Sequence, residues 1–190
     1  MFASIAVSLW VYDASDTMRF EWLDVRAPNP WINLHAGLDE STPELARRIG
    51  PPAAVLDFFS ERELTEPSIR RARKLARNDY AATPADYRSL PVENASVDLA
   101  AVIFAAHELR RPESREAFFG ELFRILRPGG RLVVVEHLRD SANFIAFGPG
   151  FLHFLPRREW TRLAKAAGFA FPLITRQTPF VAAFLMEKPR

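Results

Sequence analysis

Short runs of consecutive apolar residues recur along the chain, separated by segments with helical periodicity. Val102-Ile103-Phe104 and the stretch from Leu132 to Val135 contain no polar residue at all. A strand with one solvent-facing side alternates apolar and polar residues, whereas a strand covered on both faces of a parallel sheet is continuously apolar. The pattern therefore predicts buried strands. We expect them at residues 31–36, 53–59, 98–104 and 131–137.

The segments between these runs carry helix-end signals, with proline near the first turn and glycine or asparagine after the last. We expect helices at residues 42–49, 65–77, 112–127 and 156–167. Two final strands, near residues 169–175 and 180–186, are joined by a turn too short for a parallel crossover. These two strands should therefore pair antiparallel.

Residues 1–12 are apolar but cover only about half a membrane span. They lack the basic segment and small-residue cleavage site of a signal peptide, so we expect a helix packed on the domain or against a membrane surface. Strands and helices in alternation predict an α/β fold, a doubly wound Rossmann-like sheet that is mostly parallel, with helices on both faces. We divide the chain into an N-terminal helical lid or appendage, residues 1–30, and a domain of residues 31–190.

Composition narrows the possible functions. The chain has 190 residues, enough to bury a core without metals or disulfides. Its net charge of +2 is too small for the basic surface of a nucleic-acid binder, so we expect no nucleic-acid partner. The absence of cysteine excludes disulfides, thiolate nucleophiles and cysteine-ligated metals. It is compatible with the cytoplasm, where we expect the protein to be located.

Several motifs in the second half of the chain occur in a characteristic order and spacing. They are Asp86-Tyr87-Arg88-Ser89-Leu90-Pro91, Ala95-Ser96-Val97-Asp98, Ala105-Ala106-His107-Glu108-Leu109, residues 121–132, Glu136-His137 and Ala166-Ala167-Gly168-Phe169. Together they resemble the class I S-adenosylmethionine-dependent methyltransferases that act on small molecules. The resemblance implies a seven-stranded sheet with an antiparallel strand near its C-terminal end, and S-adenosylmethionine as cofactor.

The sequence departs from that family at the loop after the first strand, where the family has an acidic residue and three glycines. Asn33, His35 and Asp39 stand in place of the acid and two glycines, and only Gly37 is retained. Glycines there let the backbone approach the cofactor, so His35 adds bulk where its methionine part would lie. Asp39 and Glu40 at a helix N-terminus disfavour a phosphate-bearing ligand, but do not exclude a cationic one.

The resemblance assigns cofactor contacts to this loop and to further strand ends. Asp57 lies 20 residues after Gly37 and would hold the ribose hydroxyls, or simply cap the next helix. Phe58 would pack on the adenine or on the core. Asp86 and Tyr87 would border the adenine or lie in an exposed loop. The full predicted set is Asn33, His35, Ala36, Gly37, Leu38, Asp57, Phe58, Asp86, Tyr87 and Ala105.

Three of the four histidines, His35, His107 and His137, fall at predicted strand ends on one edge of the sheet. Because histidine titrates near neutrality, His107 or His137 is the expected catalytic residue, orienting the substrate or taking a proton. The alternative is that both are hydrogen-bonded residues at strand ends. A metal site with Glu108 or Glu136 is not expected, because the spacing carries no ligand signature.

Residues 143–155 hold four phenylalanines among small turn-forming residues. They predict an apolar flap rather than a regular helix, which closes a substrate pocket or plugs the core. Aromatic residues near the N-terminus would supply a lid over the same pocket: Trp10, Tyr12, Trp22 and Trp31. With 16 phenylalanines in the chain, we expect a small apolar or aromatic substrate.

Two functions of different kinds follow. The first is transfer of a methyl group from S-adenosylmethionine to a small acceptor by in-line attack, accelerated mainly by positioning. The second is a non-catalytic methyltransferase-like protein that acts as a partner or ligand-binding subunit. Loss of two glycines agrees with the second function, whereas survival of Asp57 agrees with the first. A homodimer and peripheral membrane contact stay open.

Overall fold

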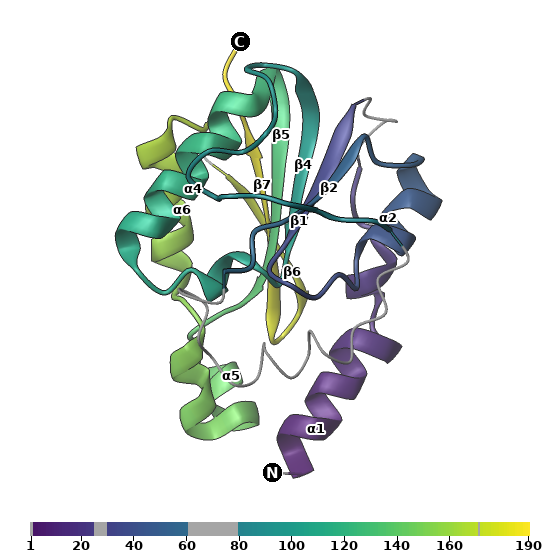
Figure 1. Cartoon of the computed structure of the whole chain (residues 1–190). Coiled ribbons are helices and arrows are strands. Elements are labelled where there is room, and N and C mark those ends of the chain that lie inside the picture. The colour runs from purple at the N-terminus through teal and green to yellow at the C-terminus, as the bar shows by residue number, and fades with distance from the viewer. Residues whose placement is uncertain (1, 25–29, 61–79, 171) are drawn as a thin grey trace.

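Seven strands form a single sheet in the computed structural model, which describes residues 2–24, 30–60, 80–170 and 172–190 (Figure 1). The sheet order is β3-β2-β1-β4-β5-β7-β6. The strands are β1 Trp31–His35, β2 Ala54–Asp57, β3 Thr83–Pro84, β4 Val97–Ile103, β5 Leu126–His137, β6 Leu173–Thr178 and β7 Val181–Glu187. Only β7 runs against the others in this sheet, pairing antiparallel with both β5 and β6. The predicted mixed sheet is confirmed.

Helices cover both faces of the sheet, as the alternating pattern predicted. Helices α4 (Pro112–Ile125) and α6 (Arg157–Ala167) lie on one face, and α2 (Thr42–Ile49) lies on the other (Figure 1). Helices α1 (Phe2–Leu9) and α5 (Ser141–Phe147) lie at the end of the molecule opposite the C-terminus (Figure 1). The helix predicted at residues 65–77 lies outside the described residues.

Two hydrophobic cores explain why the strands are apolar without alternation. Leu34, Val102 and Val134 face the core beneath α4 and α6, which includes Phe118 and Trp160. The residues between them along the strands face the opposite core, which α2 helps to cover. Each central strand therefore removes apolar side chains from water on both faces, the main favourable contribution to folding.

The N-terminal segment contributes to the second of these cores. Val11, Phe20 and Leu23 are at most 2% exposed and pack in the cluster that also holds Trp31 of β1. Helix α1 itself is more exposed, with Leu9 58% accessible. None of the helices within the described ranges is long and apolar enough to cross a membrane. A division of the chain at residue 30 stays a prediction.

Two predicted boundaries are wrong. Strand β5 begins at Leu126 rather than at residue 131, because Leu126 already pairs with Val97 before an irregularity in the register. Helix α4 correspondingly ends at Ile125. Residues 143–155 are also not an irregular flap throughout. Asp140 accepts the backbone N–H of Asn143 (3.0 Å) and caps the α-helix α5, and a 3₁₀-helix, Gly148–His153, follows.

Candidate functional site

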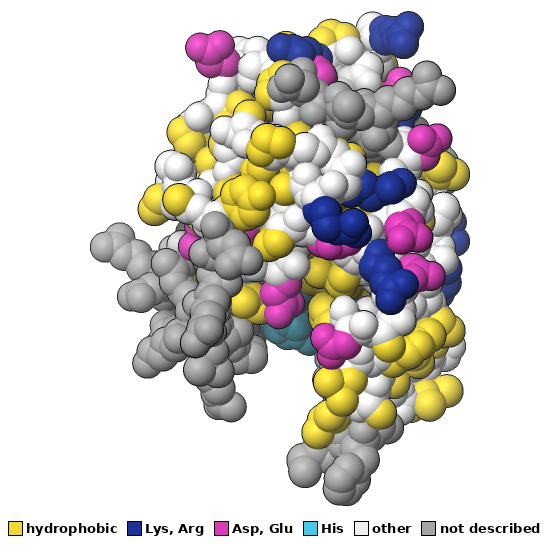
Figure 2. All heavy atoms as spheres, turned by 90° about the vertical axis from the view of Figure 1, so that its right-hand side faces the viewer, with side chains coloured by type: hydrophobic (Ala, Val, Ile, Leu, Met, Phe, Trp, Pro, Cys, Tyr) yellow, Lys and Arg dark blue, Asp and Glu magenta, His cyan; other side chains and the backbone are white. Residues whose placement is uncertain are grey.

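The strand order reverses between β1 and β4, and a cavity of about 200 Å³ lies at their carboxyl ends. This is where ligands bind in open α/β sheets. The loops after β1 and β4 and the N-terminal segment form its wall. Figure 2 shows acidic side chains at the rim of a hollow on this side of the molecule, with a histidine inside it. The residues that line this cavity include Tyr12, Ala36, Leu38, Glu40, His107 and Glu108. The cavity is smaller than the roughly 300–1,000 Å³ typical of small-molecule pockets.

His35 ends β1 and is buried at the start of the loop that follows. His35 is only 2% exposed, and its Nδ1 accepts the backbone N–H of Gly37 (3.2 Å). The same Nδ1 lies 3.8 Å from Oδ1 of Asp57. Gly37 has a φ of +89°, a conformation that favours glycine. The imidazole therefore occupies space between Gly37 and the Asp57 carboxylate that a glycine at position 35 would leave open.

Asn33 and Asp39, the other two replacements in the loop, form a buried polar network. Asn33 is fully buried, and its Nδ2 donates to Asp39 (3.1 Å), Ser41 (3.0 Å) and Thr42 (2.7 Å). Oδ1 of Asp39 also accepts the backbone N–H groups of Ser41 and Thr42. These bonds satisfy donors at the start of α2, which otherwise have no partner within the helix. The network ties the loop to α2 and points the Asn33 amide at the loop.

Asp57 ends β2 beside the β1 loop, as the family resemblance implied. Its carboxylate is 13% exposed and accepts the backbone N–H of Phe59 (2.9 Å). Phe58, by contrast, is 1% exposed and packs on Phe118 with ring centroids 4.8 Å apart. The structure therefore places Phe58 in the core, one of its two predicted alternatives, and an adenine contact by this ring stays a prediction.

The remaining predicted cofactor residues lie in different surroundings. Tyr87 is 2% exposed, and its hydroxyl donates to Ser114 of α4 (2.8 Å). The carboxylate of Asp86 is exposed and accepts the backbone N–H of Arg88 (2.9 Å). Ala105 is buried directly after β4, where a 3₁₀ turn begins. Tyr87 thus faces the core, while Asp86 faces solvent.

His107 lies between two carboxylates. Its Nδ1 donates to Glu136 (2.7 Å), a fully buried residue of β5, and its Nε2 lies 3.2 Å from Glu108. Burial works to lower the pKa of His107, but the two carboxylates outweigh it and raise the pKa to about 10. In this state the imidazole is protonated at neutral pH and acts as a donor, so it is not free to take a proton.

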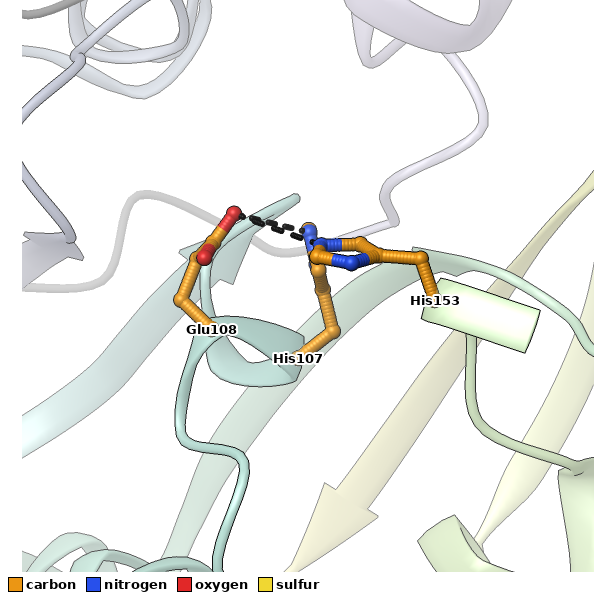
Figure 3. Close-up of side chains that lie close together, drawn as sticks. All are labelled: His107, Glu108 and His153. Carbon is orange, nitrogen blue, oxygen red and sulfur yellow. Dashed lines mark ion pairs between the residues drawn. The ribbon is translucent and has the colours of Figure 1, made fainter. Parts of the chain in front are cut away.

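His153 completes a cluster with these groups (Figure 3). Its Nε2 lies 3.8 Å from Oε1 of Glu108, and its ring stands near that of His107, with centroids 5.3 Å apart. Burial works to raise the pKa of Glu108, but the two histidines lower it to about 2. Sequence reasoning missed His153, since nothing in its spacing connects it to residue 107.

His137 is held in the opposite protonation state. Burial, together with the charge of His107, lowers its pKa to about 4. Nδ1 lies 3.1 Å from the backbone oxygen of Phe180, which can only accept, so Nδ1 carries the proton. Nε2 is then the acceptor, and it lies 3.5 Å from the Tyr12 hydroxyl. His137 is therefore neutral, with a lone pair directed at Tyr12.

Aromatic rings surround His137. Phe154 stacks on it with centroids 4.8 Å apart, and Phe104 and Phe147 lie at 5.3 and 5.4 Å. Of the predicted aromatic lid, Tyr12 lines the cavity. Trp31 is instead buried in the core and donates to the backbone oxygen of Gly50 (2.9 Å), so its assignment to a lid is wrong.

Comparison with known proteins finds a methyltransferase domain in the middle of the chain. A family model described as a methyltransferase domain matches residues 53–134. The chain is 30% identical over 122 residues to the ubiquinone/menaquinone biosynthesis C-methyltransferase UbiE of Roseobacter denitrificans, covering 61% of this chain and 45% of that protein. It is 29% identical over 171 residues to an uncharacterized 37.1 kDa protein in transposon TN4556 of Streptomyces fradiae, covering 83% and 48%. The chain spans about half the length of these relatives.

Solved structures share the fold at low sequence identity. A SAM-dependent methyltransferase from Aquifex aeolicus has a TM-score of 0.67 and 14% identity, covering 95% of this chain and 92% of that one. Human N-acetylserotonin methyltransferase in complex with SAM has a TM-score of 0.69 and 15% identity, covering 100% and 55%. The fold is thus that of a class I methyltransferase. Together with the matched domain, the fold supports the predicted resemblance to the S-adenosylmethionine-dependent methyltransferases.

Proposed function

We propose that the protein transfers a methyl group from S-adenosylmethionine to a small apolar or aromatic acceptor. The observation that carries this proposal is the acidic cavity at the carboxyl ends of β1 and β4, where the strand order reverses. The methyltransferase-domain match supports the same reaction class. The location in the cytoplasm and a homodimer stay predictions.

The residues around the cavity fit the charged part of the cofactor, which bears a sulfonium and an ammonium group. Glu40 and Glu108 both line the cavity. Burial, and then Asp13 and Asp39, raise the pKa of Glu40, so a cation placed beside it would relieve repulsion among these carboxylates. Bound there, the cofactor would supply an electrophilic methyl group.

The protein's own contribution is positioning and control of protons. His137 can take a proton through Nε2 from an acceptor hydroxyl that displaces the Tyr12 hydroxyl from that nitrogen. The rings of Phe104, Phe147 and Phe154 beside it exclude water and match a flat apolar acceptor. We therefore assign the proton-accepting role to His137 and an orienting role to His107.

The acceptor we favour is a quinol-like ring carried on an apolar tail. Apolar side chains are exposed on the N-terminal helical segment and on the α5 region, and α1 and α5 contact each other at the end of the molecule opposite the C-terminus. They are Ile5, Leu9, Trp10, Phe144, Ile145 and Leu152. Such a surface suits peripheral contact with a lipid layer. Relatives named for ubiquinone and menaquinone biosynthesis support the same class of acceptor.

Thermal unfolding with and without S-adenosylhomocysteine tests the proposal. A ligand at 100 times its Kd should stabilise the protein by about 2.7 kcal/mol. Asp57→Ala should reduce this stabilisation, because the carboxylate at the end of β2 is assigned to the ribose. The matched control is Asp98→Asn. Asp98 is the second residue of β4, and its carboxylate pairs with Arg127 (2.8 Å). This control should respond like the unaltered protein. Equal losses in both variants would contradict the assignment of Asp57.

His35→Gly is the sharper variant. Removing the buried imidazole should lower the melting temperature of the ligand-free protein, because it leaves a cavity. It should also enlarge the shift caused by S-adenosylhomocysteine, since it opens the space between Gly37 and Asp57. A smaller ligand-induced shift would mean that His35 belongs to the binding surface rather than restricting it.

The second candidate is a non-catalytic partner or ligand-binding subunit. The observations that favour it are the His35 ring between Gly37 and Asp57, and the buried network that fixes Asn33 and Asp39. Both stabilise the loop without serving a cofactor. An unchanged melting temperature at millimolar S-adenosylmethionine and S-adenosylhomocysteine would support this candidate and contradict the methyltransferase proposal.

A further inference from the structure

His107, Glu108 and His153 bring three metal-binding side chains together on one side of the cavity (Figure 3). One ligand atom from each, two imidazole nitrogens and a carboxylate oxygen, lies within 4.8 Å of the others. We propose that this cluster is a binding site for a divalent transition-metal ion, with zinc as the ion that its chemistry fits best. Two histidines and one glutamate are a recurrent ligand set of catalytic zinc sites.

The distances are close to those that a bound ion requires. Zinc lies about 2.0–2.2 Å from nitrogen and oxygen ligands, which places the donors of a tetrahedral site roughly 3.3–3.5 Å apart. Nε2 of His107 lies 3.2 Å from Oε1 of Glu108, which already matches. Nε2 of His153 lies 3.8 Å from the same oxygen. The His153 side chain is 30% exposed and lies on a short 3₁₀-helix, and its nitrogen would have to move closer to the other two donors to complete a tetrahedral site.

Two further features are those of a metal site. Nδ1 of His107 donates to the fully buried carboxylate of Glu136 (2.7 Å), and metal-binding histidines usually donate their other ring nitrogen in this way. The Glu108 side chain is only 10% exposed, and its Oε2 has no hydrogen-bond partner among the residues described. A buried carboxylate oxygen without a partner is costly, and a cation bound at the other oxygen of the same carboxylate would offset part of that cost.

The cluster would contribute three protein ligands and leave a coordination position open, as catalytic zinc sites do. His107 and Glu108 line the cavity together with Tyr12, so the open position faces the space where an acceptor would lie. An oxygen of the acceptor could bind there and be polarised. This consequence rests on the proposed function, whereas metal binding itself does not. The expectation of no metal site came from sequence spacing, which cannot show that His153 folds onto residues 107 and 108.

Titration calorimetry with zinc alone tests the site, using the full chain freed of metal with a chelator and no cofactor. We expect one zinc ion per chain. His153→Gln and Glu108→Gln should each weaken binding at least about tenfold, because each removes a ligand while keeping similar size. Glu116→Gln, which alters an exposed carboxylate of α4 outside the cluster, should bind zinc within about threefold of the unaltered protein.

Cobalt binding provides a second measurement of the same site. Its visible absorption should appear on binding to the unaltered protein and disappear in His153→Gln, whose circular dichroism and melting temperature show whether it is folded. Absence of zinc binding by the unaltered protein, or unchanged zinc affinity in folded His153→Gln, would overturn the proposal. The cluster would then be an ion-pair network around His107. Because no cofactor is present, failure here leaves the methyltransferase proposal untouched.

Discussion

His137 is a titratable side chain that the fold keeps neutral. It lies among aromatic rings, next to Asn143 and Tyr12, and within the influence of the charges on His107 and Asp140. Burial and His107 lower its pKa to about 4, whereas an unfolded chain has the ordinary histidine value of about 6.5. The unfolded state therefore binds a proton first as the pH falls, which ties protein stability to pH.

This difference predicts a pH window for stability. The contribution of His137 is fully present above pH 6.5 and is lost progressively as the pH falls through 6.5 toward 4, amounting to about 3 kcal/mol. Urea unfolding of the unaltered protein and of His137→Gln, between pH 7.5 and 4.5, measures it. The variant should lose less stability over this range. Parallel pH profiles would show that His137 does not titrate as its surroundings imply.

Single-residue roles were the least predictable part of the site. Strand ends were recognised from apolar runs, so Asp57, His107 and His137 were correctly expected on one edge of the sheet. The direction in which a side chain points could not be predicted, because an aromatic residue near a strand end can face either the core or the cavity. Phe58 and Tyr87, for example, are buried in the core.

At the scale of secondary-structure elements, a charged contact joins helices α4 and α6. Arg115 of α4 is 5% exposed, donates to the backbone oxygens of Leu109 and Arg110, and contacts Glu159 of α6 (3.0 Å). Hydrogen bonds from Arg162 and Arg115 hold the pKa of Glu159 near 2. Removing this carboxylate leaves a buried guanidinium without its counter-charge.

Glu159→Gln should therefore lower the free energy of unfolding by about 1–3 kcal/mol at pH 7. Glu116→Gln is the matched control, since Glu116 also pairs with Arg162 but both side chains are nearly half exposed. Such exposed pairs contribute at most about 1 kcal/mol. Chemical denaturation of both variants measures the difference. A loss in the control as large as in Glu159→Gln would mean that burial of Arg115 is not what makes the contact matter.

Most elements were predictable because their ends carry local signals. Pro112 and Pro156 mark the starts of α4 and α6, and Gly168 ends α6 with a φ of +99° that other residues rarely adopt. The exceptions have a physical reason. Helix α5 depends on capping by Asp140, which precedes the phenylalanine-rich segment, and the start of β5 depends on pairing with β4 across the sheet.

The N-terminal segment matters at the scale of the whole molecule. Removing residues 1–24 should unfold or severely destabilise the protein, because it strips Val11, Phe20 and Leu23 from the second core at about 1.5–3 kcal/mol each. Removing only residues 1–8 should cost much less, since α1 is largely exposed. Melting temperatures of the two truncated chains check this expectation. A folded chain lacking residues 1–24, with an unchanged melting temperature, would support residues 1–30 as a separable appendage.

The sheet was predictable as a whole, whereas the composition of its cavity was not. Continuous apolar runs indicate a parallel sheet, and the short final turn indicates the antiparallel pair. The cavity wall, however, combines Tyr12, Glu40 and Glu108, and the neighbouring cluster adds His153. These residues are far apart in sequence and meet only after the chain has folded.

Hydrogen exchange followed by mass spectrometry, with and without S-adenosylhomocysteine, tests most directly whether a nucleoside cofactor binds where β1 and β4 diverge. Bound ligand should slow exchange of the backbone amides in residues 36–42 and 104–109, while β6 and β7 exchange as before. Unchanged exchange in both loops at millimolar ligand, or protection confined to other parts of the chain, would contradict the account.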